Sequence, residues 1–433
     1  MSETLSYLSG ILFILLGIAI SIAVHELGHL WPAKRFGVKV TKYMIGFGPT
    51  LYSKQIGETE YGLKAIPLGG YIAMLGMYPP AKKPETKKGF FRDMISQARL
   101  AHSEYETPKD KNRKFFQLPV HKRMIVMFGG PFMNLVLGVV LTAIALSGFG
   151  IYQNSLKISA VSVCLDTEAS ECAVVDQTPA FVAGLKAGDE VVSVAGQKIA
   201  NWNEVRDLLS ENPTAQFELL RDGQLVSATV TAVLQPRPVF DDLGNPVLDE
   251  SGEITYRQQP FLGVFLTPER KPLPLTQSFE ASGQNIAQIG QLILRLPQEV
   301  VDITAVMLTG AERDPNGPIS IVGIGQVAGE VAASDQADFV DKFATGIQIL
   351  GSLNFALFVF NMIPLLPLDG GHIAGGVYES IKRGLYRVAG RKDPGPADTA
   401  LLMPLTYFVF IILLAVSALL ITADLLNPVS IFG

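Results

Sequence analysis

The chain is 433 residues long, which is enough for two or three domains. Hydrophobic residues make up 48% and charged residues only 17%, and the mean hydropathy is +0.31, so the composition lies on the membrane side of ordinary soluble proteins. The net charge is −5, and residues 151–340 hold 25 acidic against 11 basic side chains. This acidic balance argues against nucleic acid as a partner.

Four apolar runs are each long enough to cross a bilayer as a helix, which takes about 20 residues. They lie roughly at residues 5–24, 124–152, 343–362 and 401–421. The first run lacks the basic start and the small-residue cleavage site of a secretory signal peptide, since Glu3 precedes it. We therefore expect a retained membrane helix there.

The connections between these runs differ in charge. Residues 31–123 hold 18 Lys or Arg against 7 Asp or Glu, and residues 371–400 hold 5 against 3, whereas residues 151–340 are acidic. Basic connections stay in the cytoplasm. The pattern predicts four spans with both termini and the acidic segment outside. The acidic segment contains both cysteines, Cys164 and Cys172, so a disulfide and two separate thiols are both open.

Residues 43–75 contain two strand-like stretches around a turn at residues 55–60, with Gly and Pro at both ends. This segment is apolar for a cytoplasmic loop. We interpret it as a re-entrant β-hairpin beside the first helix, because irregular backbone at membrane depth is tolerated where protein covers it. A small cytoplasmic sheet is the alternative. The lysine-rich residues 79–120 are expected to form a solvated, partly disordered loop.

The acidic segment opens with the stretch PAFVAGLKAGDEVVSVAGQ, which begins at Pro179. Short strands, a short helix and a Gly-Asp turn are expected over residues 173–209, followed by a hairpin at Asp222–Gly223. The stretch closely resembles PDZ domains of the bacterial, protease-associated kind. A late strand is expected at residues 259–266, after an acidic insertion near residues 236–260.

The motif HELGH lies at the end of the first apolar run. On a helix, His25 and His29 share one face and can bind one metal ion, with Glu26 beside it. This is the arrangement of a zinc hydrolase, in which zinc activates water and the glutamate takes its proton. A chance match is the alternative, but ionisable groups inside a span are costly and indicate function.

A catalytic zinc site usually has a third protein ligand. Asp369 is the best candidate, because prolines and glycines must break the third span around it, and irregular backbone at that depth requires a protein or aqueous lining. An ordinary turn aspartate is the alternative. His372 is a second candidate, whereas His102 and His121 are expected to be solvated or interfacial.

HELGH, the later LDGG and the PDZ-like segment together resemble the site-2 protease family of M50-type intramembrane zinc metalloproteases, particularly its bacterial RseP-type members. The resemblance covers nearly the whole chain, although only one PDZ domain is recognisable. It implies that His25, His29 and Asp369 bind Zn²⁺ and that Glu26 is the general base. Asn361 takes the place of the family asparagine that holds substrate.

The sequence also suggests roles for residues of the hairpin and of the second and third apolar runs. The edge of the hairpin at Gly70, Tyr71 and Ile72 is expected to pair with an unwound substrate strand. Asn134 and Asn354 are expected to make packing or helix–helix contacts.

We therefore expect a zinc metalloendopeptidase of the bacterial inner membrane. The family resemblance implies that it cleaves single-span proteins within their transmembrane segments, in regulated intramembrane proteolysis of proteins such as anti-sigma factors. A PDZ-containing membrane scaffold with a vestigial metal site is the alternative, and a metal transporter is a weaker one. The lipid bilayer is a partner, and the PDZ domain would contact substrate or a regulatory partner.

The expected fold is a polytopic α-helical membrane protein with a re-entrant β-hairpin and an extracytoplasmic α+β PDZ domain. Its expected parts are a first helix at residues 1–36, a hairpin at 37–78, a basic cytoplasmic loop at 79–123, a second helix at 124–152, a PDZ domain at 158–272, a helical linker at 273–342, a third segment at 343–376, a cytoplasmic loop at 377–400 and a fourth helix at 401–424.

Overall fold

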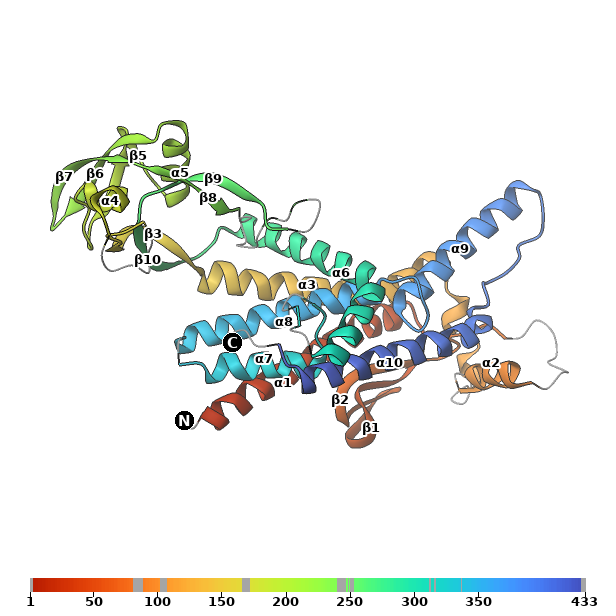
Figure 1. Ribbon diagram of the computed structural model, residues 1–433. Helices are drawn as coiled ribbons and strands as arrows, with labels where there is room; N and C mark the ends of the chain where they lie inside the picture. The colour runs from red at the N-terminus through yellow and green to blue at the C-terminus, as the bar shows by residue number, and fades with distance from the viewer. Residues whose placement is uncertain are drawn as a thin grey trace. The chain divides into compact units, whose positions relative to one another are not determined.

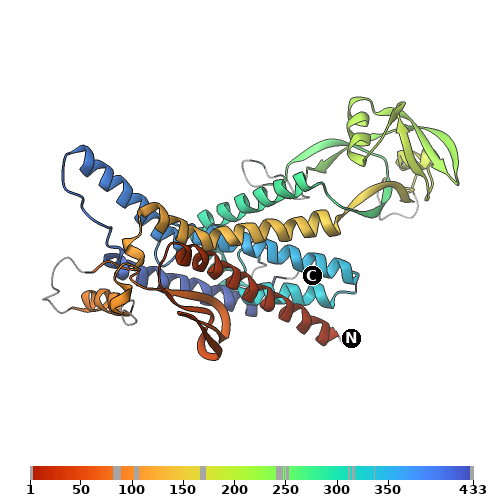
Figure 2. The same cartoon turned by 180° about the vertical axis from the view of Figure 1, so that it is seen from behind.

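The computed structural model describes residues 3–80, 89–101, 107–165, 172–239, 247, 249, 253–310, 313–314, 317–335 and 337–429. The chain divides into two compact units, which are described separately. The first unit comprises Met1–Gly148 and Pro274–Gly433, and the second comprises Phe149–Leu273. Figures 1 and 2 show the helices of the first unit and the strands of the second.

The described residues include four helices that are long and apolar enough to cross a membrane, as the sequence predicts. They are α1 (Glu3–Arg35), α3 (Val120–Ala143), α8 (Phe339–Asn361) and α10 (Met403–Leu426). A π-helical turn, η3 (Ile144–Phe149), extends α3. The chain therefore combines a set of apolar helices with substantial β structure, which fits a membrane protein with a β domain.

Helices α1 and α3 approach each other closely at a pair of glycines. A Cβ atom on Gly28 would lie 2.2 Å from the carbonyl oxygen of Gly129, and a Cβ on Gly129 would lie 2.0 Å from that of Gly28. Small residues allow this backbone contact between apolar helices. The contact brings the HELGH turn of α1 directly against α3.

The hairpin is formed by β1 (Val40–Ile56) and β2 (Thr59–Met74), which pair antiparallel around a turn within the expected residues. Both strands bend, so that Tyr43 pairs with Ile72 on one side and with Tyr61 on the other. The two strands thus behave as four segments, and the stretch around Ile72 forms an outer edge. Among the described residues no further strand pairs with that edge.

The remaining helices of this unit lie partly within the two connections that the sequence predicted as loops. The loop expected at residues 79–123 contains α2 (Phe90–Ala101) and the 3-10 turns η1 (Pro108–Asp110) and η2 (Phe115–Gln117), while parts of it lie outside the described residues. The loop expected at 377–400 begins later, because α9 (Asp369–Val388) continues through it. The other elements are α6 (Leu275–Thr309), α7 (Ile321–Ala333) and η5 (Thr399–Leu402).

The second unit is an α+β domain around one antiparallel sheet, whose strands lie in the order β10-β3-β4-β6-β7, with β5 beside β4 and a separate β8–β9 pair. A helical turn and hairpin follow the expected order. The unit begins earlier than the expected residue 158, because a long strand starts at Ile151, within the last two residues of the expected second span. Its elements are β3 (Ile151–Val161), η4 (Val174–Asp176), α4 (Pro179–Val182), β4 (Glu190–Val194), β5 (Gln197–Lys198), α5 (Trp202–Glu211), β6 (Thr214–Arg221), β7 (Gln224–Thr231), β8 (Val233–Pro238), β9 (Tyr256–Phe261) and β10 (Val264–Lys271).

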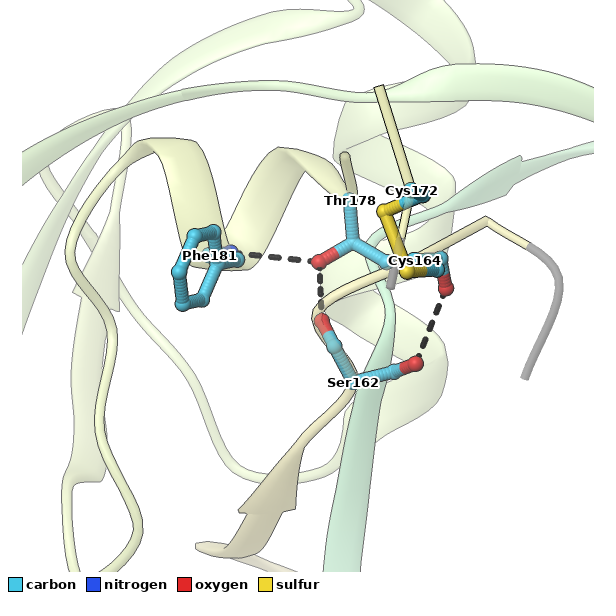
Figure 3. Close-up of a disulfide and its surroundings, with 5 residues drawn as sticks. All are labelled: Ser162, Cys164, Cys172, Thr178 and Phe181. Atoms are coloured by element: carbon cyan, nitrogen blue, oxygen red, sulfur yellow. Dashed lines mark hydrogen bonds between the residues drawn. A yellow bond between two sulfur atoms is a disulfide. The ribbon is translucent and has the colours of Figure 1, made fainter. Parts of the chain in front are cut away.

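Local contacts hold the start of this unit together. Cys164 and Cys172 form a disulfide, which resolves the two alternatives that the sequence left open (Figure 3). The Thr178 hydroxyl donates a hydrogen bond to the carbonyl oxygen of Ser162 and caps α4 by accepting from the Phe181 N–H. The disulfide loop and the first helix are thereby joined to the same strand end.

A buried ion pair fixes the Gly-Asp turn of the second unit. The Arg221 guanidinium donates two hydrogen bonds of 2.7 Å to the carboxylate of Asp189, which is fully buried. These hydrogen bonds lower the pKa of Asp189 below its ordinary value, because they stabilise the charged carboxylate. Charge-assisted hydrogen bonds therefore hold this turn, in addition to the apolar core that holds the second unit as a whole.

Candidate metal centre

Helix α1 supplies two imidazoles one turn apart. The Nε2 atoms of His25 and His29 lie 3.1 Å from each other. His29 is buried, and so is Glu26, which directly follows His25. The i, i+4 spacing places both rings on one helix face, as the sequence predicts. The two nitrogen atoms therefore point toward one common position.

Asp369 reaches the same position from the break between α8 and α9. The chain turns sharply after Asn361, and Gly370 packs so closely on this turn that a Cβ atom would lie 2.5 Å from the carbonyl oxygen of Met362. Helix α9 then begins at Asp369. The Asp369 Oδ2 atom lies 3.3 Å from Nε2 of both His25 and His29. A tight glycine-dependent turn thus delivers the carboxylate to the two imidazoles.

The three groups fit a zinc ion in donor type and in placement. One ligand atom from each of His25, His29 and Asp369 lies within 4.8 Å of the others, and no other such group occurs in the described part of the chain. Two imidazole nitrogens and a carboxylate oxygen are common zinc ligands. Gly130 of α3 leaves the necessary space, since a Cβ atom there would lie 2.2 Å from Nε2 of His29.

A second contact orients each imidazole. His29 Nδ1 lies 2.7 Å from the carbonyl oxygen of Val126, so Nδ1 carries the proton and Nε2 is free to bind metal. His25 Nδ1 lies 3.1 Å from the side-chain amide nitrogen of Asn134, while the amide oxygen of Asn134 is buried without a hydrogen-bond partner. Turning this amide over lets its oxygen accept the His25 Nδ1–H, which satisfies the oxygen and frees Nε2.

The hairpin edge lies beside Glu26. A Cβ atom on Gly70 would lie 3.0 Å from Cγ of Glu26, and the Ile72 backbone N–H is close enough to the Glu26 carboxylate to interact with its charge. Tyr71, between them, pairs with Met44 in the neighbouring segment. The three residues expected to form the substrate-binding edge therefore flank the carboxylate expected to act as the base.

The other singled-out residues lie apart from the three-ligand group. Asn361 donates a hydrogen bond to the carbonyl oxygen of Leu357, one turn earlier on α8. The ring centres of His372 and Tyr78 lie 6.5 Å apart with the rings tilted, and His372 does not belong to the ligand set. His121 is exposed, and His102 lies outside the described residues.

Two buried asparagines have different roles from each other. Asn354 donates hydrogen bonds to Ser21 of α1 and to the carbonyl oxygen of Leu350, which is the expected helix–helix contact. Asn134 of α3 contacts His25 of α1, so it makes an expected kind of contact between helices, but the sequence did not indicate that its partner is a candidate metal ligand. The contact between Asn134 and His25 is difficult to predict from the sequence, because 109 residues separate the two partners.

Comparison with known proteins agrees with this geometry. The family model for peptidase family M50 matches residues 13–392. The chain is 33% identical to zinc metalloprotease Rip1 of Mycolicibacterium smegmatis, with 98% of each chain covered, and 32% identical to zinc metalloprotease Rip1 of Mycobacterium tuberculosis strain H37Rv, with 98% of this chain and 99% of the relative covered. It is 27% identical to metalloprotease MmpA of Caulobacter vibrioides, over 87% of each chain.

These matches span nearly the whole chain, and the similar proteins are bacterial metalloproteases. With the four apolar helices they indicate a bacterial membrane protein that acts on membrane-protein substrates and requires Zn²⁺. These matches do not favour the alternative of a PDZ-containing membrane scaffold with a vestigial metal site. The chain belongs to peptidase family M50 and is an intramembrane zinc metalloprotease of the site-2 protease type.

Proposed function

We propose that His25, His29 and Asp369 hold the catalytic zinc ion and that Glu26 is the general base. The observation that carries this proposal is the convergence of two nitrogens and one carboxylate oxygen from α1 and α9 on one position. When bound, zinc would polarise the scissile carbonyl and acidify a water molecule. Glu26 accepts the proton of that water and returns it to the leaving amine nitrogen.

The substrate is proposed to bind as an extended strand along Gly70, Tyr71 and Ile72. A transmembrane helix hides its carbonyl groups in internal hydrogen bonds, so it must unwind before hydrolysis. Strand addition to the unpaired hairpin edge replaces those hydrogen bonds and depends little on side chains. Because the edge runs beside Glu26, the added strand would present its carbonyls to the catalytic group. Asn361 is proposed to hold the same strand.

The membrane placement is part of the proposal. The charge asymmetry supports both termini and the second unit on the extracytoplasmic side, with the hairpin re-entering the membrane from the cytoplasm. The disulfide of Cys164 and Cys172 suits an oxidising compartment. Single-span membrane proteins, such as anti-sigma factors in regulated intramembrane proteolysis, are the proposed substrates.

The test is direct. Purified protein should contain about one zinc per chain and should cleave a single-span substrate in proteoliposomes within its transmembrane segment. Protein without stoichiometric zinc would favour the scaffold with a vestigial metal site.

We expect Asn134→Leu to lower zinc affinity by roughly 10–100-fold, as loss of an outer contact to a metal ligand usually does. The variant keeps the side-chain size but cannot accept the His25 Nδ1–H. Asn134→Asp should retain affinity, because a carboxylate oxygen accepts the same proton. The measurement is zinc competition against a chelator in detergent.

Asn354→Leu is the matched control for this experiment. It also removes a buried amide that contacts α1, but Asn354 lies on α8 and contacts Ser21, which is not one of the proposed metal ligands. Zinc affinity should therefore be unchanged. An equal loss in both leucine variants would show that Asn134 acts through packing.

We propose that the second unit is a PDZ domain that docks substrate. Its helix α5 and the loop between β9 and β10 line a hollow of about 100 Å³, whose walls include Trp202, Arg206, Leu262 and Gly263. The sequence FLGV runs from the last residue of β9 through this loop to the first residue of β10, and it is similar to a PDZ carboxylate-binding loop. A peptide end bound there would raise the local concentration of substrate.

Excision of this unit should lower kcat/KM for a single-span substrate by roughly tenfold or more, because the local concentration is lost. Ile151 pairs with Lys271, so both ends of the unit are adjacent and a short Gly-Ser linker can replace residues 151–271. Zinc content should not change. If the shortened protein instead cleaves longer, untrimmed substrates, the unit is a size filter.

A further inference from the structure

Most of α9 carries an apolar face without a partner in the described part of the chain. Its side chains recur every three or four residues and are 43–89% exposed. They are Val377, Tyr378, Ile381, Leu385 and Val388. Figures 1 and 2 show this part of α9 projecting away from the neighbouring helices. An exposed apolar face of this kind marks an interaction surface.

A cavity of about 780 Å³ adjoins this face where α9 meets the start of α10. Its lining is mainly apolar and includes Leu365, Leu366, Ala374, Tyr378, Leu402 and Leu405. Because α10 is a candidate span and begins at Met403, the cavity lies at the end of a membrane helix. That end is where lipid headgroups meet acyl chains.

Four charged residues also line the cavity, and three of them are neutralised by partners. Arg99 lies 2.5 Å from Asp398, and Glu379 lies 2.6 Å from Arg123. The fourth is Lys382, whose ammonium lies 5.6 Å from the centre of the Tyr378 ring and is paired with no carboxylate of the described residues. The cavity therefore combines an apolar interior with one uncompensated positive charge.

We propose that this cavity binds one anionic phospholipid of the cytoplasmic leaflet. An acyl chain would fill the apolar interior, and the phosphate would contact Lys382, since lysine binds phosphate as a point charge. The apolar face of α9 would lie in the membrane interface beside it, with Lys382 at its border. The inference relies on the proposed membrane placement but not on the catalytic mechanism.

The test compares phosphatidylglycerol with phosphatidylcholine of identical acyl chains. Full-length protein is purified from nanodiscs that contain both lipids, and the retained lipid is measured by native mass spectrometry. Wild type should retain one phosphatidylglycerol per chain in preference to phosphatidylcholine. Lys382→Glu should reduce this preference at least about fivefold, the effect of roughly one basic contact to an anionic lipid.

Two variants make the test specific. Arg387→Glu makes the same charge change on an exposed part of α9 outside the cavity, and it should keep the preference. Ala374→Leu enlarges a side chain in the cavity wall, so it should expel both lipids. Zinc content and substrate cleavage are measured on the same samples, so a failure of catalysis is distinguished from a failure of lipid binding.

Equal retention of the two lipids by wild type would overturn the inference, and so would equal losses in Lys382→Glu and Arg387→Glu. A second copy of the chain is the rival occupant of the apolar face. A dimer that Ile381→Ser and Leu385→Ser dissociate, together with no preference of wild type for phosphatidylglycerol, would also overturn it.

Discussion

Glu26→Gln is expected to retain zinc but to lose roughly 10²–10⁴-fold in kcat, the usual contribution of a general base. The amide matches the carboxylate in size but cannot accept the proton of the attacking water. The three proposed zinc ligands, His25, His29 and Asp369, are untouched. The experiment measures zinc content and single-turnover cleavage of a reconstituted single-span substrate on the same preparation.

The control for Glu26→Gln is Glu211→Gln, which makes the same change at an exposed position at the end of α5. It should cleave as wild type does. If Glu26→Gln keeps its zinc and still cleaves at the wild-type rate, another group takes the proton and the proposed mechanism is wrong.

Asp369→Asn should reduce zinc affinity by more than the roughly 10–100-fold expected for an outer contact, because it removes the charge of a direct ligand. The amide keeps the shape of the turn at the start of α9, so a loss of metal would be due to the ligand itself. Cleavage should be lost in proportion to the zinc. Metal analysis and chelator competition measure the effect.

His372→Gln tests the rival ligand that the sequence left open. It lies one helical turn from Asp369 but outside the ligand set, so the variant should retain zinc. If His372→Gln loses zinc while Asp369→Asn retains it, His372 and not Asp369 is the third zinc ligand.

Local sequence patterns predicted much of this molecule. Helix periodicity places His25 and His29 on one face whatever surrounds them, and apolar length identifies the four candidate spans. Prolines and glycines around Asp369 predict a broken helix, and the structure has a turn there followed by a new helix. The disulfide and the length of α9 were not decided by such patterns, since both depend on contacts or continuations that composition does not reveal.

The site itself required the tertiary structure. Residue patterns alone predict a two-histidine metal motif on an apolar helix, a candidate carboxylate and an apolar hairpin. Only the packing of α3 on α1 through Gly28 and Gly129 decided that Asn134 contacts His25. Only the folding of β1 against two parts of β2 decided which edge lies beside Glu26. This difference follows from separation along the chain. Residue spacing fixes which side chains are neighbours within one helix or strand, whereas contacts between distant segments depend on the close packing of whole elements.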